Sequence, residues 1–321
     1  MNWLRLIRWK NLLIIFLTQY LVWQFVIWAE RSNFENATPH LLLNFLNFFC
    51  LALSTVLIAA AGYIINDYFD IKIDIINRPG KVVLEKAIPL KTAIVAHSSL
   101  NLIGLLLAAY VAKQAHHYEW LSLQVLCTTL LWFYSTNFKR QFMIGNVVVA
   151  LLTALTIIVL LIYEPIMHYY THVPMFPGNS EKPLGAIPLW IIIIYSCFAF
   201  MLTWMREIVK DMEDFKGDAE QGCVTMPIKW GLKRSANFTI LLGALTILPL
   251  ICGSVILFLF NYIVLGCYIS IVLVLPLIAW CVQLWKATTT DQYAKSSRNL
   301  KIIMLFGICS VLVYNFEKFW P

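Results

Sequence analysis

Long apolar segments alternate with short polar ones along most of the chain. A helix needs roughly 20 mostly apolar residues to cross the hydrocarbon core of a bilayer. We place nine such helices, at about residues 11–29, 41–65, 92–112, 118–135, 143–163, 187–206, 236–257, 261–284 and 300–319. The boundary between the seventh and eighth is weakly marked, because residues 239–285 are almost continuously apolar. The pattern predicts an all-α, polytopic membrane protein formed by one domain over residues 1–321.

The composition agrees with this prediction. The 321 residues are 60% hydrophobic and 13% charged, whereas a soluble domain is about 25% charged. The eight cysteines are scattered, with neither CxxC spacing nor a disulfide framework, and indicate packing. The opening "MNWLRLIRWKN" leads into the first span without a small-residue cleavage site, so we expect no cleavable signal peptide.

Basic residues gather on one side of the predicted topology. The N-terminus and the loops after spans 2, 4, 6 and 8 hold 20 of the 24 Lys and Arg residues. The opposite side holds Arg31, Lys113, Lys182 and Lys318. Because cytoplasmic loops are enriched in Lys and Arg, we expect the N-terminus inside and the C-terminus outside. This distribution accounts for the net charge of +7, so we expect membrane lipids as partners and no nucleic acid.

Acidic residues form two clusters where apolar spans end. "INDYFDIKID" follows the second span and "MREIVKDMEDFKGD" follows the sixth, both on the predicted cytoplasmic side. An unpaired charge near the bilayer centre costs about 2.5–3.5 kcal/mol, and neighbouring acids repel one another. Each cluster therefore needs a compensating partner.

Helical spacing places the polar residues of the first cluster on one stripe. Asn66, Asp70 and Asp74 are four residues apart, and Asp67 is seven residues before Asp74.

The second cluster has the same property if its helix is continuous. Glu207, Asp211, Asp214 and Asp218 follow one another in steps of four, three and four. Basic residues form an adjacent stripe, at Arg206 and Lys210.

So many carboxylates indicate a divalent cation, since hard oxygen ligands are what such ions prefer. Mg²⁺ suits partial carboxylate coordination that substrate phosphates complete. The predicted metal ligands, which are also the predicted catalytic residues, are Asp67, Asp70, Asp74, Asp211, Asp214 and Asp218.

The position of the acids distinguishes chemistry from transport. A transporter holds charges near the midplane of broken helices, whereas these acids lie at helix ends. Basic residues accompany them, at Arg78, Lys81, Lys139, Arg140, Arg206 and Lys210. Acids, a metal and surrounding cations suit a diphosphate, and the apolar helices suit a lipid tail. Because such a site also stabilises diphosphate as a leaving group, the pattern favours an enzyme that ionises an allylic diphosphate.

Four segments resemble the UbiA superfamily of intramembrane prenyltransferases. "NDYFDIKID" is similar to its NDxxDxxxD motif, and the second cluster is similar to its second aspartate motif. "YSTNFKR", Tyr134 to Arg140, resembles its YSxxxKR element, and "RWKN", Arg8 to Asn11, resembles the start of its first helix. The resemblance extends to about Gly231. It implies nine helices around a central cavity open to lipid, with Mg²⁺ bridging the diphosphate and both aspartate motifs.

The diphosphate chemistry and the resemblance together give a set of substrate-binding residues beside the aspartates. They are Asn11, Asn66, Arg78, Lys81, Tyr134, Lys139, Arg140, Arg206 and Lys210.

Within the superfamily, "REIVKDMEDFKGD" followed by "GCVTMPIKWG" most resembles the geranylgeranylglyceryl phosphate geranylgeranyltransferase branch. That branch implies geranylgeranyl diphosphate as the donor and a glycerol phosphate ether lipid as the lipophilic acceptor. After "NRP" the branch usually has a proline-rich turn, whereas this chain has "GKVVLEKAIPL". Prenylation of an aromatic quinone or tetrapyrrole precursor therefore stays open, and a non-enzymatic ion transporter is a more distant alternative. The CDP-alcohol phosphotransferases are disfavoured, because their signature begins Asp-Gly and this chain has no such dipeptide.

Overall fold

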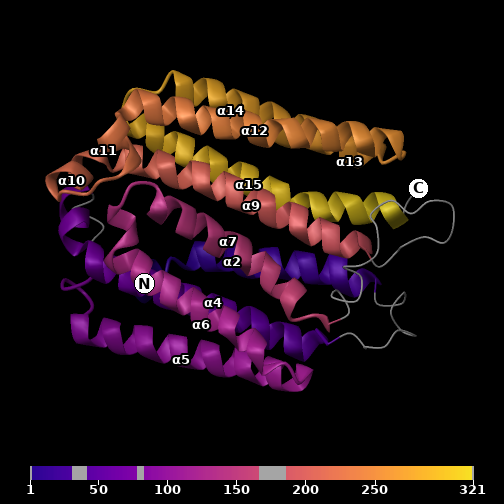
Figure 1. Ribbon diagram of the computed structural model, residues 1–321, viewed down its shortest axis with the longest axis horizontal. Coiled ribbons are helices and arrows are strands. Elements are labelled where there is room, and N and C mark those ends of the chain that lie inside the picture. Colours follow the sequence, from indigo (N-terminus) through magenta and orange to yellow (C-terminus); the bar gives the residue numbers. More distant parts are fainter. Residues whose placement is uncertain (1, 31–41, 78–82, 166–185, 320–321) are drawn as a thin grey trace. The chain divides into compact units, whose positions relative to one another are not determined.

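The structure, a computed structural model, describes residues 2–30, 42–77, 83–165 and 186–319 (Figure 1). In these ranges the regular elements are helices, and the only extended pairing is a single bridge between Leu84 and Ile88. The predicted all-α class is therefore confirmed.

The chain divides into two compact units. Unit 1 comprises Met1–Thr136 and Ala154–Ser196, and unit 2 comprises Asn137–Thr153 and Cys197–Pro321. Two helices, α7 (Ile144–Ile162) and α9 (Ala186–Glu213), contribute residues to both units. The expectation of one domain over the whole chain stays a prediction.

Unit 1 is built around one long helix, α4, which packs against α2, α5 and α6 (Figure 1). Its elements, besides parts of α7 and α9, are α1 (Asn2–Leu6), α2 (Trp9–Val22), η1 (Trp23–Ile27), η2 (Trp28–Glu30), α4 (Phe45–Asn77), α5 (Leu90–Ala115), η3 (Tyr118–Trp120) and α6 (Leu121–Thr136). Small residues allow α4 and α5 to approach closely. A Cβ atom at Gly104 of α5 would lie 3.2 Å from the backbone oxygen of Ser54 and 2.9 Å from Cγ1 of Ile58.

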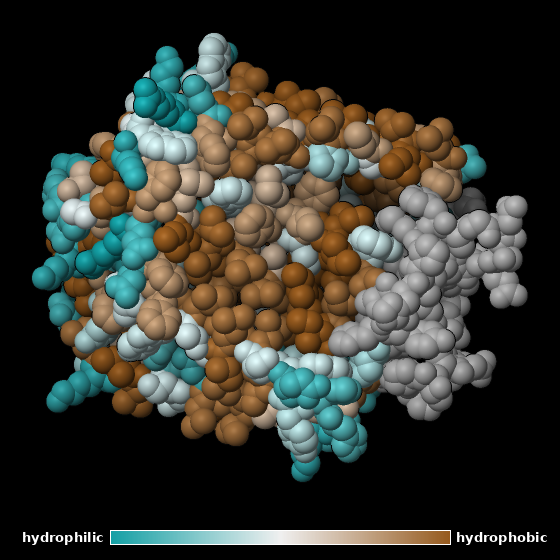
Figure 2. Space-filling model, in the orientation of Figure 1, coloured by the Kyte–Doolittle hydropathy of each residue, from teal (hydrophilic) through white to brown (hydrophobic). Residues whose placement is uncertain are grey.

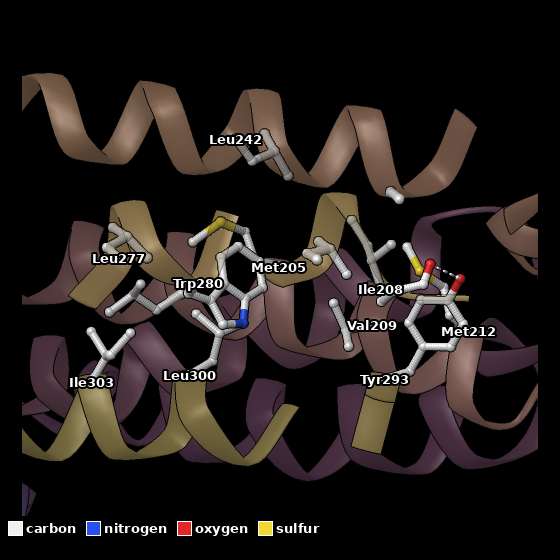
Figure 3. Close-up of a cluster of buried hydrophobic side chains, with 14 of the residues drawn as sticks. Met205, Ile208, Val209, Met212, Leu242, Leu277, Trp280, Tyr293, Leu300 and Ile303 are labelled. Carbon is white, nitrogen blue, oxygen red and sulfur yellow. Dashed lines mark hydrogen bonds between the residues drawn. The ribbon is translucent and has the colours of Figure 1, made fainter. Parts of the chain in front are cut away.

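Unit 2 has its core where α9, α12, α14 and α15 meet (Figure 3). Its elements, besides parts of α7 and α9, are η4 (Phe138–Arg140), α10 (Phe215–Glu220), α11 (Met226–Trp230), α12 (Leu232–Leu259), α13 (Ile263–Tyr268), η6 (Ile269–Val274), α14 (Leu275–Trp285) and α15 (Thr290–Phe319). Two large rings can be buried in this core because their polar atoms have hydrogen-bond partners. Trp280 Nε1 donates to the Ser296 oxygen at 3.0 Å, and Tyr293 Oη donates to the Ala287 oxygen at 3.2 Å.

Eight helices in the described ranges are long and apolar enough to cross a membrane. The predicted fourth span, residues 118–135, differs from the others. Its helix, α6, has 16 residues and is about 24 Å long at 1.5 Å per residue, short of a hydrocarbon core of about 30 Å. Polar residues limit it on both sides, at His117, Glu119, Asn137 and Lys139. The predicted number of nine is therefore approximate.

The boundary between the predicted seventh and eighth spans is confirmed. α12 ends at Leu259 and α13 begins at Ile263. The turn between them holds Asn261 at φ 63°, a left-handed conformation that Asn tolerates better than most residues. The last helix, by contrast, begins at Thr290 rather than near residue 300.

Hydrophobic side chains cover the sides of the helices over much of the face in Figure 2, and hydrophilic ones gather toward helix ends. On α5, for example, Leu102 and Leu106 are 59% and 61% exposed. An exposed apolar surface of this extent suits contact with lipid tails.

Candidate active site

The first aspartate motif lies on an unbroken helix, as predicted. α4 continues to Asn77, so Asn66, Asp67, Asp70 and Asp74 share one helical register. Asn66 Nδ2 donates to Asp70 Oδ2 at 2.8 Å. The other amide atom, Asn66 Oδ1, is buried and accepts no hydrogen bond. Asn66 therefore orients one carboxylate and has an unused acceptor beside it.

The N-terminal segment binds directly to this motif. Arg8 Nη2 lies 2.7 Å from Asp67 Oδ1, and the guanidinium lies 5.0 Å from the centroid of the Tyr63 ring. Asn11 Nδ2 donates to Tyr63 Oη at 3.3 Å. The sequence indicated Asn11 through a family resemblance but assigned Arg8 no role. Because Asp67 requires a countercharge, the sequence could have indicated that a basic residue such as Arg8 pairs with it.

The turn between α1 and α2 holds Arg8 in an uncommon backbone conformation. Its φ and ψ are 52° and 50°, in the left-handed region that costs an ordinary residue roughly 1–2 kcal/mol. Leu6, two residues earlier, is 1% exposed and packs in a cluster that includes Ile64 of α4. Burial lowers the pKa of the Arg8 guanidinium, but the charge of Asp67 and the Tyr63 hydroxyl outweigh it, so that pKa lies above its ordinary value. Packing and charge thus hold Arg8 at the acidic end of α4.

The second motif lies on a broken helix, so the continuous helix that a single stripe requires is not present. α9 ends at Glu213, and Asp214, with φ −91° and ψ 8°, precedes α10. Asp214 occupies the N-cap position of α10 but makes no side-chain capping hydrogen bond there. The stripe through Glu207 and Asp211 lies on α9, whereas Asp218 lies in α10.

Contacts in unit 2 divide the acids of α9 into two kinds. Both oxygens of Glu207 accept from cations, from Arg206 Nη1 at 2.8 Å and from Lys210 Nζ at 2.8 Å. Asp211 Oδ2 instead accepts from the amide Nδ2 of Asn146 at 2.8 Å. Sequence reasoning missed Asn146, although a polar residue in the first turn of an apolar helix was a usable signal; the structure shows that it is buried.

The basic turn η4 is hydrogen-bonded to the segment that joins α10 and α11. The Arg140 oxygen accepts a hydrogen bond from Val224 N at 2.8 Å. A Cβ atom at Gly145 would lie 2.7 Å from Cα of Lys139, so only glycine permits this approach. The other end of the predicted "YSTNFKR" element, Tyr134, belongs to unit 1.

The structure thus divides the predicted site residues between the units. Unit 1 contains Asn11, Asn66, Asp67, Asp70, Asp74 and Tyr134. Unit 2 contains Lys139, Arg140, Arg206, Lys210, Asp211, Asp214 and Asp218. Arg78 and Lys81 lie outside the described residues.

The donors in each unit suit a hard divalent cation by their chemistry. Carboxylate oxygens, and the buried amide oxygen of Asn66, are the ligand type that Mg²⁺ prefers. Within the ranges that the structure describes, no three His, Cys, Asp or Glu side chains form a group that could hold a metal ion. The assignment of the metal ligands stays a prediction.

Apolar helices that end in acids, amides and cations define an integral membrane protein that crosses the bilayer several times. The model of the UbiA prenyltransferase family matches residues 22–308. The chain belongs to this family and is a prenyltransferase.

Relatives and solved structures agree with this assignment. The chain is 29% identical to digeranylgeranylglyceryl phosphate synthase of Thermococcus sibiricus, over 80% of this chain and 81% of the relative. It is 30% identical to the synthase of that name from Saccharolobus solfataricus, over 84% of each chain. A structure from work on digeranylgeranylglyceryl phosphate synthase in membranes is 26% identical, with a TM-score of 0.64 over 98% of this chain and 97% of that one. A UbiA homologue from Archaeoglobus fulgidus, bound to GPP and Mg²⁺, shares the fold, with 15% identity and a TM-score of 0.55 over 97% of this chain and all of that one.

Replacing Arg8 with Met tests the ion pair with Asp67. The variant keeps a long apolar side chain but leaves the carboxylate without its cation, so we expect a loss of about 1.5–3 kcal/mol. Thermal unfolding in detergent with EDTA measures it. The double variant Arg8→Met, Asp67→Asn should regain part of the stability, because no uncompensated charge remains. Arg5→Met, on the exposed Arg5 of α1, is the control, and an equal loss there would contradict a specific role for Arg8.

Proposed function

We propose that the protein transfers a geranylgeranyl group from geranylgeranyl diphosphate to geranylgeranylglyceryl phosphate or a related glycerol phosphate ether lipid. The main support is the similarity to digeranylgeranylglyceryl phosphate synthases, which extends over 80% and 84% of this chain in the two relatives described above. The A. fulgidus homologue bound to GPP and Mg²⁺ supports a prenyl diphosphate donor and a divalent cation.

The carboxylates of the two aspartate motifs are the proposed metal ligands. In this proposal Asp67, Asp70 and Asp74 of α4, with Asp211, Asp214 and Asp218, hold Mg²⁺. When bound, the metal supplies positive charge that stabilises the diphosphate leaving group. The amide contacts of Asn66 to Asp70 and of Asn146 to Asp211 orient two of these carboxylates.

The neighbouring basic residues are the proposed ligands of the diphosphate oxygens. They are Arg78, Lys81, Lys139, Arg140, Arg206 and Lys210. In the reaction the bond between the allylic carbon and the diphosphate oxygen breaks, and diphosphate leaves with the electron pair. The acceptor hydroxyl oxygen forms the new bond to that carbon and releases its proton. The apolar helices accommodate the prenyl chain.

Incubation of the purified protein with radiolabelled geranylgeranyl diphosphate and a panel of acceptors tests this function. The panel contains geranylgeranylglyceryl phosphate, an aromatic quinone precursor and a tetrapyrrole. We expect label to reach only the glycerol phosphate, activity to disappear in EDTA, and Mg²⁺ to restore it. Transfer only to an aromatic or tetrapyrrole acceptor would contradict the proposed acceptor, and full turnover in EDTA would contradict the metal.

A second prediction separates a ligand from a bystander on α9. Glu213 is two residues after Asp211, roughly 200° around the helix, and both lie before the bend at Asp214. Asp211→Asn removes a charge that helps to stabilise the leaving group, so we expect kcat to fall on the order of 10²–10³-fold. Glu213→Gln is equally isosteric and should keep most activity. Equal losses of kcat in the two variants would show that the position of an acid around α9 does not determine whether it binds the metal.

We also propose that the N-terminus and both aspartate motifs lie on the cytoplasmic side and the C-terminus outside. The distribution of 20 of the 24 basic residues supports this orientation. In a variant without the eight native cysteines, Glu119→Cys and Lys216→Cys place single thiols at two exposed positions. A membrane-impermeant maleimide applied to intact cells should label only the thiol at 119. Labelling of both thiols, or only of that at 216, would contradict the orientation.

A further inference from the structure

Glu207 is an acidic residue of the second motif that the proposed metal site does not use. Its side chain is 8% exposed, whereas those of its two partners, Arg206 and Lys210, are each 24% exposed. Each carboxylate oxygen lies 2.8 Å from one of the two cations. Removing a carboxylate from water is costly, and well-placed cations are needed to offset that cost. Glu207 therefore acts through its two partners, Arg206 and Lys210.

The two cations need an anion between them. Arg206 and Lys210 are four residues apart on α9 and repel one another. Long basic side chains lose rotamer entropy when they are fixed, and without a partner they extend toward water. Glu207 opposes both effects, because one buried carboxylate holds both cationic groups against the helix.

Arg206 has a donor that Glu207 does not satisfy. Its Nε atom is buried and makes no hydrogen bond, while its Nη1 binds Glu207. A buried donor without an acceptor is costly, and the guanidinium fork matches the oxygens of a phosphate group. The three side chains carry a net charge of +1, so they still attract an anion.

We propose that Glu207 is a positioning residue, which holds Arg206 and Lys210 in place for the diphosphate of the prenyl donor and does not bind the metal. The inference rests on the proposed function, since it takes the diphosphate as the ligand. Asp211 is one turn further along α9, so the positioned cations lie next to the acids of the same motif.

Calorimetric titration of the purified protein with inorganic diphosphate, at saturating Mg²⁺, tests this role. Loss of the carboxylate frees both cations, so we expect Glu207→Gln to raise the Kd for diphosphate about tenfold or more, the effect of losing roughly 1.4 kcal/mol. Glu207→Asp, which keeps the charge on a shorter side chain, should recover part of the affinity. Glu213→Gln, the matched control near the end of α9, should bind as the wild type does. In turnover, KM for the prenyl diphosphate should rise while KM for the acceptor stays unchanged.

A stability effect alone gives a different result. If Glu207 only supports the fold, the melting temperature and the number of binding sites fall but the Kd of the folded fraction stays the same, which would overturn the proposal. A Kd that returns to the wild-type value when Mg²⁺ is raised further would make Glu207 a metal ligand and would also overturn it. The Lys210→Gln background gives a second measurement, because a residue that acts through Lys210 should have a smaller effect on Kd there.

The titration also separates this inference from the proposed function. A wild-type protein that binds no diphosphate at any Mg²⁺ concentration contradicts the proposed function itself. A wild-type protein that binds diphosphate, with Glu207→Gln binding it equally well, contradicts only the role of Glu207.

Discussion

The negative charge of a carboxylate at the end of an apolar helix has to be balanced by a cation or by hydrogen-bond donors. The arrangement of this protein follows from that constraint. Without water to solvate it, each acid needs a cation, an amide or a row of backbone N–H groups. The α1–α2 turn brings Arg8 to Asp67, although 59 residues separate them. α7 brings Asn146 to Asp211, across 65 residues. The acids thus determine which segments of the chain meet at the helix ends.

The same constraint applies to two acids outside the aspartate motifs. Both oxygens of the fully buried Glu164 accept from the backbone N–H groups of Leu42 and Leu43, at 3.0 and 2.8 Å, just before α4. Glu317 of α15 accepts from two N–H groups in the first turn of α13, both at 2.8 Å. The first N–H groups of a helix have no partner within it and carry a partial positive charge. Glu317 satisfies two of these groups in α13, whereas Glu164 binds the non-helical segment that leads into α4.

The sequence predicts those parts of the site that one helix contains. The stripe of Asn66, Asp70 and Asp74 follows from helical period alone, because the residues are local and α4 is unbroken. The bend at Asp214 was missed, since an Asp that begins a helix and an Asp inside one look alike in a charged segment. Arg8 and Asn146 could not be assigned partners, because no local pattern links residues about 60 positions apart. Hydropathy likewise found α6, and its predicted range, residues 118–135, was already shorter than the neighbouring ranges.

The kind of partner that an acid has indicates what remains for it to do. An amide orients a carboxylate without adding a countercharge, as Asn66 does for Asp70 and Asn146 does for Asp211. Two cations, by contrast, more than neutralise Glu207. A divalent cation needs ligands that are oriented and that no other cation already pairs, and an amide partner provides the orientation without such a pairing. Glu207, although it continues the same acidic stripe, serves instead to gather positive charge, which is what a departing diphosphate requires.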